Sequence, residues 1–131
     1  MFGTFQQSTV RVQVAATAAT IKRCLTDFSL MRQWAVLQSY PSTLPKELTD
    51  GLEFTSTFGI IPLGHRVAEL TPDSLKLVLW GGVDGYTQWH WGDGWVQLTV
   101  AGVSLIPLAL GQTALVESLV RFATDLDHAV A

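Results

Sequence analysis

Two adjacent polar side chains, His65 and Arg66, stand at the start of an apolar-patterned segment and are the first candidates for chemistry. In an extended strand they point to opposite faces. Arg66 shares its parity with Ala68 and Leu70, which predicts that Arg66 faces inward. A buried guanidinium needs an anionic ligand or an acidic partner; the alternative is a rim position with its stem on apolar surface. His65 would serve as an acid–base group only if this parity is reversed.

Tyr86 is a third polar candidate, as a group that orients a ligand or takes part in proton transfer. It shares a strand face with Gln88 and His90, and this polar set favours solvent exposure for His90. Arg66, His65 and Tyr86 are therefore the three weak candidates for catalysis.

The sequence offers no pattern for a metal, a cofactor or a catalytic nucleophile. His65, His90 and His128 show no paired ligand spacing, and Cys24 is the only cysteine. There is no Gly-x-Ser-x-Gly motif, and the glycines of 81–85 lie between predicted strands instead of opening a helix. We therefore expect neither a metal site nor a bound cofactor.

Aromatic side chains gather in one glycine-rich stretch and suggest a binding function. The tryptophans of this stretch are Trp80, Trp89, Trp91 and Trp95. Trp89 and Trp91 share a strand face and would join Phe54 and Phe58 if both strands point these positions inward. Such rings can line a cavity or fill a core, and both interpretations stay open.

A long amphipathic helix is predicted over Leu105–Val130, with Pro107 suited to its first turn. At 100° per residue its apolar side chains occupy one broad arc: Leu108, Leu115, Val116, Leu119, Phe122, Ala123, Leu126 and Val130. The width of this arc favours a curved partner surface, such as a bent antiparallel sheet. Leu115, Leu119 and Phe122 are expected at its centre.

The rest of the chain alternates as strands do, apart from two short helices after the first strand. Thr17 is predicted to cap the first of these helices, and Ser29 the second, which carries Trp34. Pro62–Gly64 is predicted as a turn. The predicted strands are 5–14, 52–60, 65–71, 75–80, 86–91 and 95–101. This order predicts an α+β fold with about six to seven antiparallel strands, in one domain over residues 1–131.

The composition limits the classes of molecule that the protein is expected to bind. The net charge is −3 and the eight basic residues are scattered, which argues against nucleic acid. Hydrophobic residues make up 48% of the chain and the mean hydropathy is +0.30, leaving scope for a cavity or a subunit interface. With no signal-peptide or membrane-spanning pattern, and with Cys24 as a buried structural thiol, we expect a cytoplasmic protein.

Three segments carry a recognisable pattern: Phe5–Val10, Asp27-Phe28 followed by Trp34, and His65–Pro72 continuing through Leu75–Leu79. In these segments the sequence resembles the START-like (SRPBCC) superfamily, which includes polyketide cyclase/dehydrase-type proteins. The resemblance implies a helix-grip fold, in which the sheet wraps the C-terminal helix and encloses a pocket for an apolar or aromatic molecule. It does not imply one reaction, because such relatives include binders, transfer proteins and enzymes.

The leading functional prediction is binding or carrying of an apolar, ring-containing small molecule, such as a lipid, between sheet and helix. The predicted ligand-binding residues are Trp34, Phe54, Phe58, Arg66, Trp80, Tyr86, Trp89, Trp91, Leu115, Leu119 and Phe122. One alternative is a cyclase, aromatase or dehydratase that uses Arg66, His65 or Tyr86. Another is an interaction module or homodimer built on exposed tryptophans.

Overall fold

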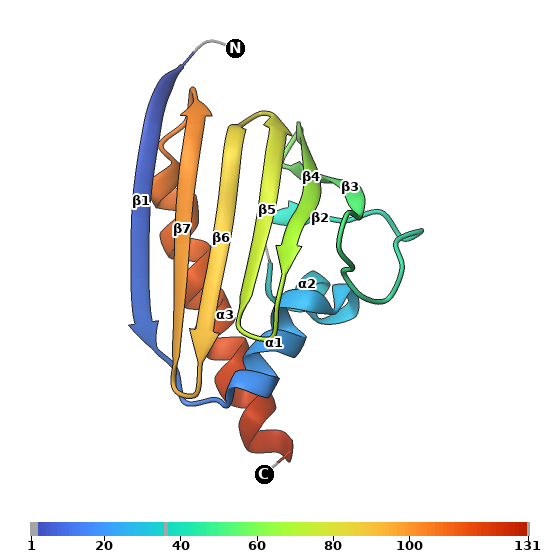
Figure 1. Cartoon of the computed structure of the whole chain (residues 1–131), viewed down its shortest axis with the longest axis vertical. Helices are drawn as coiled ribbons and strands as arrows, with labels where there is room; N and C mark the ends of the chain where they lie inside the picture. The colour runs from blue at the N-terminus through green and yellow to red at the C-terminus, as the bar shows by residue number, and fades with distance from the viewer. Residues whose placement is uncertain (1–2, 36, 131) are drawn as a thin grey trace.

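A curved antiparallel sheet and a long C-terminal helix form the two main layers of the protein in a computed structural model that describes residues 3–35 and 37–130 (Figure 1). The strands are β1 (Thr4–Gln13), β2 (Gln38–Ser39), β3 (Glu53–Phe58), β4 (Ile61–Leu70), β5 (Ser74–Gly81), β6 (Asp84–Gly92) and β7 (Trp95–Ser104). They pair in the order β1-β7-β6-β5-β4-β3-β2. The helices are α1 (Ala18–Thr26), α2 (Phe28–Trp34) and α3 (Leu108–Val130).

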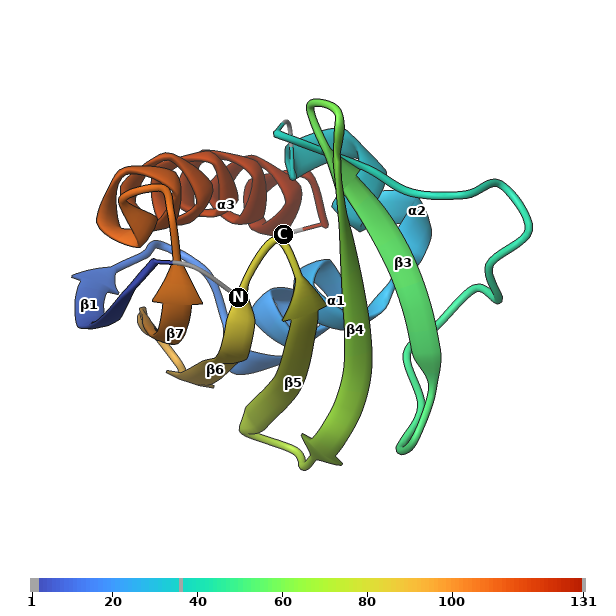
Figure 2. The same cartoon turned by 90° about the horizontal axis from the view of Figure 1, so that it is seen from above.

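The sheet is an open half-barrel, and α3 lies across its open side (Figure 2). This arrangement confirms the predicted α+β helix-grip fold, with two short helices after the first strand. Among the described residues, no helix combines the length and the apolar composition needed to cross a membrane.

The caps of the short helices explain where they begin. Thr17 caps α1 as predicted, because its hydroxyl oxygen accepts the N–H of Thr20 at 3.3 Å. The cap predicted at Ser29 is wrong: Asp27 caps α2, and its carboxylate accepts the N–H of Ser29 at 2.8 Å. Asp27 is both the C-cap of α1 and the N-cap of α2, so α2 follows α1 without a loop.

Helix α3 begins at Leu108, three residues later than predicted. Its first N–H is capped from another element, because Leu108 donates to the side-chain oxygen of Gln6 on β1 at 2.8 Å. At its other end, Asp127 accepts the hydroxyl of Thr20 at 2.8 Å, and this bond lowers the pKa of Asp127. Both ends of α3 are thus tied to the N-terminal part of the chain.

The apolar arc of α3 faces the sheet. Val116, Leu119 and Ala123 are buried, and Leu115 and Phe122 are partly buried. The side chain of Val130, the last predicted member of the arc, lies outside the described residues.

The turn predicted at Pro62–Gly64 is wrong, because these residues belong to β4. Pro62 pairs with Thr57 across the β3–β4 hairpin. The chain reverses at Gly59 and Ile60 instead, where Gly59 takes a φ of +64° that favours glycine. An exposed hairpin tip follows, with Ile60 95% exposed.

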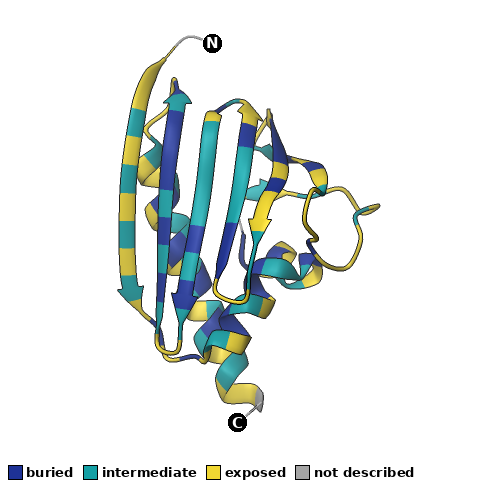
Figure 3. Ribbon diagram, in the orientation of Figure 1, coloured by how far each residue is buried: buried dark blue, intermediate teal, exposed yellow. Residues whose placement is uncertain are grey.

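Burial is concentrated on the concave face of the central strands, whereas edge strand β1 alternates between exposed and partly buried residues (Figure 3). The main core cluster surrounds α1 and α2 and includes Phe28, Trp34 and Trp89. Cys24 lies within it, fully buried, and burial raises the pKa of its thiol to about 11. Cys24 is therefore a structural thiol, as predicted.

Candidate functional site

A cavity of about 510 Å³ lies between the concave face of the sheet and the beginning of α3. It occupies the end of the half-barrel away from α1, the upper end in Figure 1. Its walls come from β2 to β7, the residue before β2, the β5–β6 and β7–α3 connections and the first turns of α3. The lining residues are Leu37, Gln38, Phe58, Ile61, Leu63, Leu79, Gly82, Val83, Tyr86, Thr87, Leu98, Val100, Ala101, Ser104, Leu105, Ile106, Pro107, Leu108, Leu110, Gly111, Gln112 and Leu115.

The cavity wall is mainly aliphatic. A small cluster of buried side chains, Leu63, Leu79 and Val83, forms its floor, separate from the main core cluster. No charged side chain is present among the described lining residues. Such a wall favours uncharged, apolar guests, because it offers no partner to a buried charge.

Apolar side chains also surround the mouth of the cavity. Leu105 and Leu110 line it and are 77% and 72% exposed, and Leu37, Ile61 and Ile106 line it while each remains more than a third exposed. The apolar surface is therefore continuous from the solvent to the interior, so a hydrophobic molecule can enter without crossing a charged rim.

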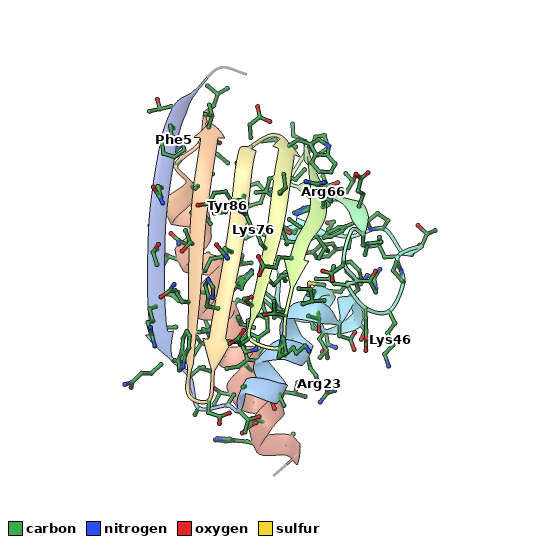
Figure 4. All side chains as sticks on the ribbon, in the orientation of Figure 1. Phe5, Arg23, Lys46, Arg66, Lys76 and Tyr86 are labelled. Carbon is green, nitrogen blue, oxygen red and sulfur yellow. The ribbon has the colours of Figure 1, made fainter. Side chains whose placement is uncertain are left out.

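Three of the predicted ligand-binding residues line the cavity: Phe58, Tyr86 and Leu115. Tyr86 nevertheless belongs to the outer face of β6, because its ring lies 4.6 Å from the ammonium nitrogen of Lys76 (Figure 4). Its hydroxyl is thus a poor candidate for contact with a guest.

Most of the predicted aromatic residues fill the core and leave the cavity wall to aliphatic side chains. Trp89 packs edge-on against Trp34, with ring centroids 6.1 Å apart, and the indole N–H of Trp34 donates to the carbonyl of Cys24 at 2.8 Å. Trp91 and Phe54 are likewise buried in this cluster. Leu119 and Phe122, from the predicted set, also pack there and do not line the cavity.

Trp80 lies on the outer face of the sheet, 42% exposed, and covers Gly64 on the neighbouring strand. A Cβ at Gly64 would lie 2.0 Å from the Trp80 ring, so only glycine leaves room for the indole. Trp80 is therefore a surface residue and does not contact the cavity.

The inward orientation predicted for Arg66 is wrong, because Arg66 is exposed on the outer face. The cause is a β-bulge: the register between β4 and β5 shifts between Val67 and Glu69, leaving Ala68 as an extra residue. The extra residue reverses the parity between Leu70 and Arg66. His65 takes the inward position instead.

His65 is buried and neutral. One ring nitrogen, Nε2, lies 2.8 Å from the Ser56 hydroxyl, and the ring stacks on Phe54 with centroids 4.6 Å apart. Burial lowers the pKa of His65 to about 4. A serine–histidine pair can act as nucleophile and base, but His65 and Ser56 are 5% and 1% exposed and neither lines the cavity. The pair therefore packs the interior and has no route to a substrate.

Gln112 and Thr87 are cavity residues that the sequence interpretation missed. Gln112 is 2% exposed and is four residues from both Leu108 and Val116, so it falls within the apolar arc of α3. A polar side chain on an otherwise apolar helix face was the available signal. Thr87 shares the inward face of β6 with Trp89, which gives the same kind of signal.

No three histidine, cysteine, aspartate or glutamate side chains converge into a metal-binding group within the part of the chain that the structure describes.

Solved structures similar to this chain share its architecture along almost its whole length. Protein CV1439 from Chromobacterium violaceum is 14% identical, with a TM-score of 0.74 over 90% of this chain and 97% of that one. Major latex-like protein 151 from Panax ginseng is 8% identical, with a TM-score of 0.71 over 95% and 99%. CalU16 from Micromonospora echinospora is 15% identical, with a TM-score of 0.69 over 92% and 77%.

No protein-family model matches the sequence, and a comparison with curated protein sequences gave no match. The similarity therefore lies in the backbone: the order of elements, the seven-stranded curved sheet and the helix across it. At these identities it establishes the fold and leaves the ligand open. The chain therefore has the helix-grip fold that these solved structures share.

Proposed function

We propose that this protein binds or carries an apolar small molecule in the cavity between the sheet and α3. The observation that carries the proposal is a cavity of about 510 Å³ with an aliphatic wall and an open apolar mouth. This volume lies within the range of roughly 300–1,000 Å³ that is usual for small-molecule sites. Burial of the apolar surface of the guest would supply most of the affinity.

The proposal rests on aliphatic contact and not on stacking of rings. The tryptophans that suggested a ring-containing guest fill the core or lie outside, and Phe58 is the aromatic side chain that contributes most plainly to the wall. The aliphatic wall can therefore contact a flat apolar guest or an extended one equally well.

An enzymatic function has less support. Of the three candidates for acid–base chemistry, Arg66 is exposed outside, His65 is sealed in the core, and Tyr86 turns its ring to Lys76. The described lining contains no carboxylate, imidazole, thiol or ammonium group. An interaction surface of exposed tryptophans also has less support, since Trp89 is 4% exposed, Trp95 is only partly exposed and Trp80 is 42% exposed.

Filling the cavity should abolish binding. Thr87 lies on the inward face of β6 and lines the cavity, so Thr87→Phe places a ring where a guest would lie. We expect the variant to fold and to bind prodan, a neutral fluorescent naphthalene ketone, at least about tenfold more weakly than the wild type, because the ring removes guest volume. Fluorescence titration measures this.

The matched control is Gln88→Phe, which adds the same ring one residue later, on the outer face. It should bind prodan as the wild type does. Absence of prodan binding to the wild type, or equal weakening by both substitutions, would overturn the proposed function.

A further inference from the structure

The side chain of Gln112 is held in one orientation by the sheet. Its amide nitrogen, Nε2, donates to the carbonyl of Leu98 on β7 at 2.8 Å and to that of Ser8 on β1 at 3.1 Å. Both amide hydrogens are thus used. A flipped amide would place its oxygen against two carbonyl oxygens, so the orientation is fixed by chemistry.

The oxygen of the same amide, Oε1, is buried and accepts no hydrogen bond from any described residue. A buried acceptor without a donor lowers the stability of the folded protein, because the group has lost its hydrogen bond to water. Gln112 also belongs to the cavity wall, where α3 faces β7. One residue of a mainly aliphatic wall therefore retains an unsatisfied acceptor.

The other glutamine of the wall is different. Gln38 stands near the mouth, and its side-chain oxygen already accepts the hydroxyl of Tyr40 at 2.8 Å. The side-chain oxygen of Gln38 therefore already has a hydrogen-bond donor. The two glutamines form a natural comparison within one cavity.

We propose that Oε1 of Gln112 accepts a hydrogen bond from a hydroxyl or N–H group of the bound molecule. The cavity then selects a neutral, apolar guest that carries a donor, such as an alcohol or a phenol, over the matching ether. This inference rests on the proposed function and specifies its ligand class. A site that contains an unpaired polar group binds a ligand that can pair with this group more tightly than a ligand that cannot.

The same arrangement disfavours an ionised carboxylate. A carboxylate has no donor for Oε1, and the described wall contains no cation to compensate its charge. A fatty acid or another anionic guest is therefore expected to bind more weakly than the corresponding alcohol.

The test compares 2-naphthol with 2-methoxynaphthalene, which has the same ring system without the donor, by displacement of prodan. The selectivity is the Kd of the ether divided by the Kd of the alcohol. In Gln112→Met, which lacks the acceptor, we expect this selectivity to fall about tenfold below its wild-type value, the effect of one buried hydrogen bond. In Gln38→Met it should stay unchanged.

An equal selectivity in the wild type and Gln112→Met would overturn the inference while leaving the proposed function standing, because both naphthalenes would still bind. Failure of every naphthalene and of prodan to bind the wild type would overturn the proposed function itself.

A second measurement needs no variant and covers the case in which Gln112→Met fails to fold. In the wild-type protein, saturating 2-naphthol should shift the 13C resonance of the Gln112 side-chain carbonyl, whereas 2-methoxynaphthalene should leave it close to its free position. Equal shifts with both compounds would contradict the inference.

Discussion

Leu119→Arg is expected to abolish cooperative folding. Leu119 is 1% exposed and packs in the main core cluster, where α3 meets the sheet and the short helices. An arginine there loses the apolar contacts and places a charge among groups that cannot pair with it, which costs several kcal/mol and is comparable to the whole stability of a small domain. Circular dichroism with thermal and urea unfolding measures the result.

Thr113→Arg is the matched control, because Thr113 lies on the exposed face of the same helix. This variant should unfold with a midpoint close to that of the wild type. A soluble Leu119→Arg protein with a cooperative transition would contradict the assignment of the buried arc of α3.

Acid is expected to destabilise the protein between about pH 6.5 and pH 4 through His65. The unfolded chain binds a proton at this histidine below about pH 6.5, whereas the folded chain binds it only below about pH 4. The free energy of unfolding therefore falls as the pH decreases through this range and levels off below it. The difference corresponds to about 3 kcal/mol. Urea unfolding at a series of pH values measures it.

His65→Gln should remove most of this pH dependence, whatever it does to the absolute stability. His90→Gln changes a partly exposed histidine on the outer face and should keep the wild-type dependence. If His65→Gln retained the full loss of stability between pH 6.5 and pH 4, the buried, neutral state of His65 would be wrong.

The fold was predictable because periodicity reports which face of an element is buried. The apolar arc of α3 and the alternation of Leu52, Phe54 and Phe58 against threonines both survive in the structure. These patterns depend only on side chains and the geometry of one element. The start of α3 was less predictable, because its first N–H is capped by Gln6 from a strand about one hundred residues away.

The orientation of Arg66 was not predictable from alternation alone. The bulge at Ala68 inserts a residue without any glycine or proline to mark it, and one inserted residue reverses every side chain on one side of it. As a result, the polar residue at the inward position is His65, whose Nε2 pairs with the Ser56 hydroxyl in the core, whereas its Nδ1 has no partner among the described residues.

The location of the cavity depended on how the large rings pack. Trp34, on α2, meets Trp89 and fills the end of the half-barrel that the short helices cover. The opposite end receives shorter side chains, such as Val83, Val100 and Leu115, and remains open. Contacts between elements distant in sequence decide this distribution, so residue types alone could not show which aromatic side chains line a site.

The position of the guest is the central claim, and methyl NMR tests it most directly. With a saturating neutral naphthalene ligand, the methyl resonances of Val83, Val100 and Leu115 in the cavity wall should shift, whereas those of Ile21 and Leu25 in the main core should stay nearly unchanged. Shifts confined to residues around Trp80 on the outer face, or no shifts at all, would contradict binding between the sheet and α3.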